Sequence, residues 1–252
     1  MEQNTERVNV AQKPDNPSEQ PAISPYQTLI SCLSGTQTNT ESLHALVQTC
    51  ASPYALILFR IAPQRSAIHL QDIINVADNL HICYANMQDS IVAFLSYEDL
   101  HRFIETVTEK GKAGTILVAF SLPFTSLESI PLQYELLCYC LDSKKDAGVF
   151  DAKDSALAFL TSKITSSIDT EDLLHPAIAK LARYDQVNQS NLLHTLKVYL
   201  EHDRNAQRCA NLLYLHRNSL QYRVRRIQEI ADINLDDPYE RSYLRLSFLL
   251  SR

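Results

Sequence analysis

The spacing of apolar residues changes character once along this chain of 252 residues. Across residues 54–120, short runs rich in β-branched and apolar residues alternate with helical patterns, in the order strand, helix, strand, strand, helix, strand. Across residues 176–252 only helical periodicity is found. The order βαββαβ is the split βαβ arrangement of ferredoxin-like sheets. The sequence therefore predicts an α+β chain, in which a ferredoxin-like domain is followed by an all-α domain.

The expected elements divide the chain into four segments. Residues 1–24 are polar and aperiodic, and we expect a disordered tail there. Residues 25–165 form the sheet-containing domain with its N-terminal helices, residues 166–172 form a polar linker, and residues 173–252 form the helical domain. Up to the linker we expect helices at 26–33, 40–50, 67–80, 98–110, 127–141 and 153–164, strands at 54–61, 81–87, 90–94 and 115–120, and a short apolar piece at 148–150.

Two helix starts near the C-terminus are marked by specific residues. Pro176 can open a helix at its first turn. Further on, Asp237 followed by Pro238 and Glu240 combines an N-cap, a proline at the first helical position and a capping-box carboxylate. On this last helix we expect an inward-facing set of Tyr239, Tyr243, Leu246 and Leu250.

Several enzyme classes lack their sequence motifs in this chain. It has only 4 glycines, and the motifs GxGxxG and GxxxxGK[ST], which bind nucleotide phosphates, are absent. A GxSxG motif and an HxxxH pair are absent as well. We therefore expect a protein without enzymatic activity, cofactor or bound metal.

The cysteines and the start of the chain bear on its compartment. The six cysteines show no CxxC spacing and lie mostly in apolar segments, so we expect reduced thiols and no disulfides. The N-terminal segment has neither a basic start nor an apolar stretch, and the longest apolar runs are too short to span a bilayer. We expect a cytoplasmic protein that does not enter the membrane.

Charge is distributed unevenly along the chain, whose net charge is −6. Residues 191–252 contain ten Lys or Arg against seven Asp or Glu, and residues 204–228 contain six arginines and no carboxylate. Such a stretch attracts phosphate polymers at short range, although a charge run taken alone is as often a solvated helix face. The spacing of the residues must decide between these two interpretations.

Residues 205–229 have the pattern of a helix-turn-helix, with a helix of about nine residues, a three-residue break and a longer helix. Ala210 supplies a small side chain where the two helices would cross. Leu220, Val224 and Ile227 recur on the side of the second helix that we expect to be buried. Arg223 projects closer to that side, and His216 at the turn is expected to cap or pack the turn.

The exposed side of the second helix carries the side chains that a major groove can use. Amides read adenine edges, and guanidinium groups read guanine or bind phosphate. Base edges are usually met at the N-terminus of this helix, and the start of the first helix is placed for the DNA backbone. The predicted DNA-binding residues are Arg204, Asn205 and Arg208 on the first helix, and Arg217, Asn218, Ser219, Gln221, Tyr222, Arg225 and Arg226 on the second.

These residues carry a resemblance to a known family. Residues 192–250 closely resemble the C-terminal DNA-binding domain of the PucR/CdaR group of bacterial regulators. The hallmark His216-Arg217-Asn218-Ser219-Leu220 is followed by Tyr222-Arg223 and Arg226-Ile227, with Ser219 where the family usually has Thr. Upstream, Leu174-His175-Pro176 and Tyr184-Asp185 are similar to the family's preceding helix, so the resemblance covers residues 173–252. Residues 115–163 are similar to the degenerate GGDEF-like domain that such regulators carry.

A working cyclase of the GGDEF fold needs acidic metal ligands at its first strand and a glycine-rich acidic turn between its second and third strands. No carboxylate occurs in residues 49–70, and residues 86–89 contain one acid and no glycine. We therefore expect a sensory or dimerising role for this domain rather than catalysis.

The resemblance implies a sequence-specific transcriptional regulator that binds double-stranded DNA and responds to an effector of unknown identity. Because a single helix-turn-helix offers few base contacts, we expect a homodimer or larger oligomer. The alternative is a signalling module with a catalytically dead cyclase-like domain, whose helical tail binds protein. The acidic net charge favours that alternative.

Overall fold

The computed structural model describes residues 24–34, 46–61, 68–87, 89–110 and 116–251. The expected tail at 1–24 lies outside the described residues except for Ser24, and the expected helix at 40–50 is described only from residue 46. The chain forms two compact units, Met1–Ser155 and Ala156–Arg252. Each unit is built around its own core.

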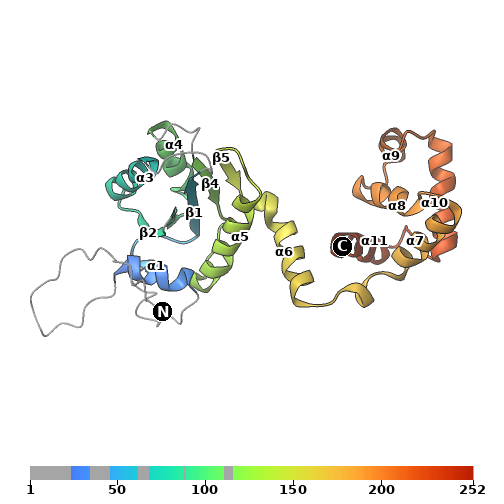
Figure 1. The fold of residues 1–252 in the computed structure, drawn as a ribbon, viewed down its shortest axis with the longest axis horizontal. Helices are drawn as coiled ribbons and strands as arrows, with labels where there is room; N and C mark the ends of the chain where they lie inside the picture. Colours follow the sequence, from blue (N-terminus) through green and yellow to red (C-terminus); the bar gives the residue numbers. More distant parts are fainter. Residues whose placement is uncertain (1–23, 35–45, 62–67, 88, 111–115, 252) are drawn as a thin grey trace, which may run out of the picture. The chain divides into compact units, whose positions relative to one another are not determined.

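The first unit contains a five-stranded sheet in the order β2-β3-β1-β4-β5 (Figure 1). The first four strands in the chain pair antiparallel, and β5 joins the edge of β4 in parallel. Strands β2-β3-β1-β4 with two connecting helices are the expected ferredoxin-like βαββαβ unit, which is confirmed. The strands are β1 (Tyr54–Ile61), β2 (Cys83–Met87), β3 (Ser90–Ser96), β4 (Ile116–Phe120) and β5 (Gly148–Asp151).

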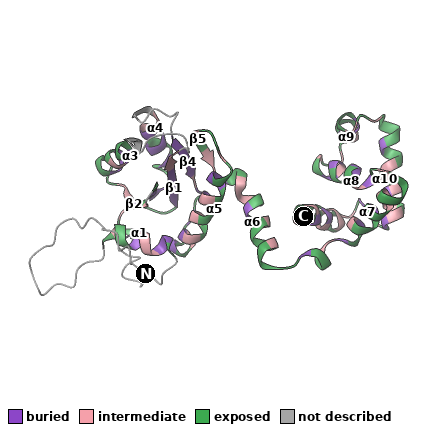
Figure 2. Cartoon of the chain, viewed as in Figure 1, coloured by how far each residue is buried: buried purple, intermediate pink, exposed green. Residues whose placement is uncertain are grey.

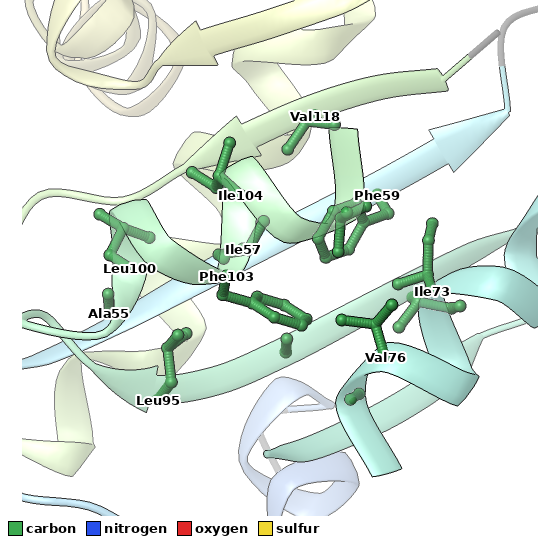
Figure 3. Packing of buried hydrophobic residues seen from close by; sticks show 14 of the residues in the cluster. Ala55, Ile57, Phe59, Ile73, Val76, Leu95, Leu100, Phe103, Ile104 and Val118 are labelled. Carbon is green, nitrogen blue, oxygen red and sulfur yellow. The ribbon is translucent and has the colours of Figure 1, made fainter. Parts of the chain in front are cut away.

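Helices α3 (Ile68–Asn79) and α4 (Leu100–Lys110) cover one face of this sheet. The side chains of Phe59 and Phe103 meet edge to face, with ring centroids 5.8 Å apart, at the centre of an apolar cluster (Figure 3). Burial of side chains of this size stabilises the fold by about 1.5–3 kcal/mol each. Helices α1 (Pro25–Leu33) and α5 (Ile130–Asp142), the latter preceded by a 3-10 turn at Leu127–Ser129, complete the unit.

None of the cysteines in the described segments is part of a disulfide. Burial raises the pKa of Cys50 to about 11 and that of Cys83 to about 12. Both thiols are therefore protonated at neutral pH, which makes them poor nucleophiles. Within the described residues, no three His, Cys, Asp or Glu side chains gather as they would around a metal ion.

The second unit is entirely helical. Its helices are α6 (Lys153–Ser167), which begins in the last residues of the first unit, a 3-10 turn at Glu171–Leu173, α7 (Pro176–Asn188), α8 (Leu192–Glu201), α9 (Ala206–Leu212), α10 (Arg217–Ala231) and α11 (Pro238–Leu250). The structure differs from the expected linker at 166–172, because α6 continues to Ser167 and the two units divide at Ser155. None of the described helices is both long and apolar enough to cross a bilayer.

His175 fixes the start of α7 to α11. Its Nδ1 accepts a hydrogen bond from the backbone N–H of Ala177 at 3.1 Å, and its Nε2 lies 3.2 Å from Oε2 of Glu240. Its backbone N–H donates to the Ser247 hydroxyl at 2.8 Å. The expected opening of α7 by Pro176 is confirmed, and the contacts of His175 explain why residues upstream of α8 belong to this unit.

The last helix starts as expected but turns a different face inward. Asp237 is its N-cap and accepts from the N–H of Tyr239, whereas the carboxylate of Glu240 contacts His175. Tyr239 is 73% exposed and Leu246 is 48% exposed, so the expected inward set was wrong for these two residues. Leu244 and Ser247 are the buried residues of this helix.

Candidate nucleic-acid interface

Helices α9 and α10 form a helix-turn-helix joined by residues 213–216. Leu220 of α10 is fully buried against Val198, Cys209 and Ala210, and the small side chain of Ala210 at this crossing confirms the expectation from sequence. Further along α10, Ile227 is fully buried in the larger core of the unit. One side of α10 is thereby buried, and exposed residues occur along the length of the helix (Figure 2).

The N-terminus of α10 is capped by a histidine. Nδ1 of His216 accepts a hydrogen bond from the backbone N–H of Asn218 at 3.2 Å. The expected capping role of His216 is therefore observed. Because Nδ1 is the acceptor, the neutral ring carries its proton on Nε2. The cap fixes the end of the helix that begins with Arg217.

Replacing His216 by alanine removes this acceptor from the first turn of α10. We expect the loss of an N-cap to cost about 1 kcal/mol of helix stability. Hydrogen exchange at the amides of the first turn of α10 measures the change. His216→Ser supplies another capping side chain and should exchange more slowly than His216→Ala; equal exchange in the two variants would contradict the capping role.

The exposed side of α10 presents cations and amides to solvent. Six of the predicted residues lie there: Arg217, Asn218, Ser219, Gln221, Tyr222 and Arg225. Within the described part of the chain, no side-chain hydrogen bond or ion pair engages Arg217, Gln221 or Arg225. The guanidinium groups of Arg217 and Arg225 are thus available to a ligand without breaking an internal contact.

Arg226 and Arg223 are held by the protein. The guanidinium of Arg226 lies 3.1 Å from Oε2 of Glu229. Its Cζ atom also lies over the ring of Tyr184, 5.8 Å from the ring centroid. Hydrogen bonds to Tyr184 and Glu229 raise the pKa of Arg226. Arg223 donates to the hydroxyl of Thr195 at 3.2 Å, in agreement with its expected position near the buried side.

The residues at the start of α9 also differ in their surroundings. Arg204 is bound to Oδ1 of Asp236 at 2.7 Å and to the carbonyl of Leu235 at 3.1 Å. Asn205 is the N-cap of α9, where its side chain accepts from the N–H of Arg208 at 3.0 Å. Arg208 itself is exposed, and its guanidinium has no partner among the described residues. Of these three residues, Arg208 is the one whose side chain is free to meet an anion.

Three carboxylates that flank the arginine-rich stretch are paired internally. Asp203 contacts Arg245 at 2.7 Å, Glu229 contacts Arg226 and Asp236 contacts Arg204. Each pair places an anion beside a cation, which reduces its repulsion of a third charged group. Within the described part of residues 204–228, the arginines without a carboxylate partner are Arg208, Arg217, Arg223 and Arg225, and of these Arg223 donates to the Thr195 hydroxyl.

A hollow of about 620 Å³ lies beside the N-terminal half of α10. The spacing of residues in the sequence did not predict that the junction of α7 and α8 lies here. The carboxylate of Asp185 accepts from the N–H groups of Leu192 and Leu193, both at 2.8 Å, and so caps α8. The hollow is lined by Tyr184, Ser190, Asn191, Leu192, Leu215, Asn218, Ser219, Tyr222, Arg223 and Arg226.

Comparison with known proteins identifies this region. Residues 192–250 match the family described as the PucR C-terminal helix-turn-helix domain. The resemblance seen in the sequence is thereby confirmed for the helix-turn-helix part of the chain. The GGDEF-like character of the middle segment stays a prediction.

Three curated relatives with similar sequences are regulators of Bacillus subtilis (strain 168). The DNA-binding transcriptional activator AdeR is 21% identical over 229 residues, which are 83% of this chain and 54% of AdeR. The purine catabolism regulatory protein is 37% identical over 84 residues, 33% of this chain and 16% of that protein. The proline-responsive transcriptional activator PutR is 33% identical over 75 residues, 30% of this chain and 18% of PutR. The chain thus spans about half the length of AdeR and less of the other two.

A solved structure is similar along most of the chain. The regulator of polyketide synthase expression from Bifidobacterium adolescentis matches with a TM-score of 0.45 and 12% identity, covering 90% of this chain and 91% of that one.

Proposed function

We propose that this chain is a transcriptional regulator that binds double-stranded DNA by placing α10 in the major groove. One observation carries the proposal: α10 is buried on one side and presents unpaired guanidinium and amide groups on the other, in a stretch without carboxylates. A second helix held in this way can enter the groove and read base edges from its N-terminal residues. The relatives' description as transcriptional regulators supports the proposal.

The predicted contact residues take different roles in this proposal. Four residues of α10 read base edges: Arg217, Asn218, Gln221 and Arg225. Ser219 and Tyr222 lie beside them, and Arg208 binds a phosphate. Arg204, Asn205 and Arg226 act as positioning residues, because their side chains already bind within the unit. Arg204 joins the start of α9 to the loop before α11, and Asn205 caps α9. Arg226 joins α10 to Tyr184 of α7.

In this proposal, the protein acts in the cytoplasm as a homodimer or larger oligomer and has no catalytic activity. Two copies are needed because one helix-turn-helix contacts a single half-site, and half-sites lie about one helical turn apart. The sheet-containing unit is then free to supply the oligomer contact or to bind an effector. Sedimentation of the full chain tests the oligomeric state, and a monomer at micromolar concentration would contradict it.

Salt dependence tests DNA binding without knowledge of the operator. The affinity of the full chain for a random duplex is expected to fall with added salt, with a log-log slope of several units, because bound cations release counterions from the DNA. Arg208→Ala should reduce the magnitude of this slope by about 1. Lys197→Ala removes the same charge from an exposed site on α8 and should leave the slope unchanged.

A flat salt response of the wild type would favour the alternative in which the helical unit binds protein. Selection of duplexes from random DNA then completes the test. Enrichment of two similar half-sites with constant spacing is the expected outcome, and failure to enrich any sequence would count against sequence-specific binding.

A further inference from the structure

The turn between α9 and α10 places a tyrosine where glycine is favoured. The N–H of Tyr214 donates to the carbonyl of Asn211 at 3.2 Å, and the N–H of Leu215 donates to the carbonyl of Ala210 at 2.8 Å. These two bonds form a Schellman motif, whose residue after the C-cap adopts the left-handed conformation. Tyr214 has φ 54°, a region that glycine enters freely and a bulky side chain enters at a cost.

Packing does not compensate for this backbone strain. The side chain of Tyr214 is 96% exposed, whereas its neighbour Leu213 packs into the core of the helix-turn-helix. The other positive-φ residues among the described ones are His81, Gln189, Asp203, Arg204 and Asp232, so Tyr214 is the one tyrosine in that group. A strained residue whose side chain gains nothing from burial points to a role outside the folded unit.

The position of Tyr214 indicates what it meets. Tyr214 lies in the turn between the end of α9 at Leu212 and the start of α10 at Arg217. In a bound helix-turn-helix the first helix crosses the DNA backbone, and the N-terminus of the second meets base edges. In that arrangement, the turn that joins the end of α9 to the start of α10 runs along the wall of the groove, which is formed by sugar and phosphate.

We propose that Tyr214 is a DNA-backbone contact, in which the phenol hydroxyl donates to a phosphate oxygen and the ring packs on the adjacent sugar. Tyrosine hydroxyls are among the groups that bind phosphate oxygens in protein–DNA complexes. The inference rests on the proposed function, because it assumes that α10 enters the groove. It adds a neutral anchor beside the base-reading end of the helix.

Tyr214→Gly separates this contact from stability. Glycine relieves the left-handed strain, so the variant should melt no lower than the wild type. Its affinity should fall about 3- to 10-fold, equally for a duplex enriched by selection and for a random duplex, because a backbone contact carries no sequence information. The salt slope should stay unchanged, because no charge is removed. Tyr214→Phe should show a smaller loss, since it retains the ring.

The control is Tyr239→Ala, which removes a 73% exposed tyrosine from α11 and should leave the affinity unchanged. Unchanged DNA affinity in Tyr214→Gly would overturn the inference, as would a loss confined to self-association. Arg225→Ala is measured in the same assay. If wild-type binding is strong and Arg225→Ala weakens it while Tyr214→Gly does not, the inference about Tyr214 fails and the proposed function stands.

Discussion

Replacing Arg217 and Arg225 together by alanine is expected to weaken binding to the selected duplex by about 2–6 kcal/mol, roughly 30-fold or more. Each guanidinium that reads a guanine edge contributes about 1–3 kcal/mol of discrimination. Neither side chain has a partner among the described residues, so the variant should fold as the wild type does. Fluorescence anisotropy with a labelled duplex at fixed salt measures the loss.

The double variant removes two charges, so its control must do the same. Lys153→Ala with Lys197→Ala removes two exposed cations from α6 and α8, outside the helix-turn-helix. This control should lose little affinity, whereas loss of specificity is expected only for the double arginine variant. Equal affinities of the two double variants would show that net charge rather than the face of α10 governs binding.

Replacing Leu220 by alanine is expected to cost about 2–5 kcal/mol of the stability of the second unit. Leu220 is fully buried, and its side chain is the contact that holds the N-terminal half of α10 on α9 and α8. Its removal leaves a cavity between elements that cannot close without moving the base-reading end of the helix. Hydrogen exchange of the α8, α9 and α10 amides reports the free energy of opening of this unit by itself.

Leu246 supplies the matched control for that experiment. It is 48% exposed on α11, so Leu246→Ala should change the same opening free energy by no more than about 0.5 kcal/mol. DNA affinity should fall for Leu220→Ala and stay near the wild-type value for Leu246→Ala. A loss below 1 kcal/mol for Leu220→Ala would mean that the helix-turn-helix is not held by this cluster.

The elements that the sequence predicted well are those in which burial follows a simple period. Central strand β1 begins with an unbroken apolar run from Tyr54 to Phe59, and the spacing of Leu220, Val224 and Ile227 identified the buried side of α10. In both cases the spacing of apolar residues that are close in the sequence indicates which residues are buried. The ferredoxin-like order and the helix-turn-helix followed from these local patterns.

The contacts that the sequence did not reveal join residues far apart in the chain. Arg204 and Arg226 appeared free in a run without carboxylates, yet they bind Asp236 and Tyr184 from other helices or loops. On α11, two adjacent faces carry apolar residues, and only packing against the other helices selects Leu244 over Leu246. The expected linker at 166–172 begins inside α6, because the polar residues at the end of this helix still form helical turns.

Tyr214 shows a second limit of reasoning from spacing. In the sequence, a tyrosine between two leucines is typical of an apolar run that would be buried. The exposure of Tyr214 follows from the backbone conformation of the Schellman motif. The left-handed conformation turns this residue outward while Leu213 packs inward. Such a position is visible in backbone angles and exposure rather than in composition.

The central claim is that the exposed face of α10 lies in the major groove of a duplex. A crystal structure of the full chain with a duplex enriched by selection tests it most directly. We expect α10 in the major groove, with Arg217 and Arg225 within hydrogen-bond distance of base edges and Arg208 at a phosphate. A complex in which the duplex lies against another surface, with these arginines facing solvent or another protein segment, would contradict the account.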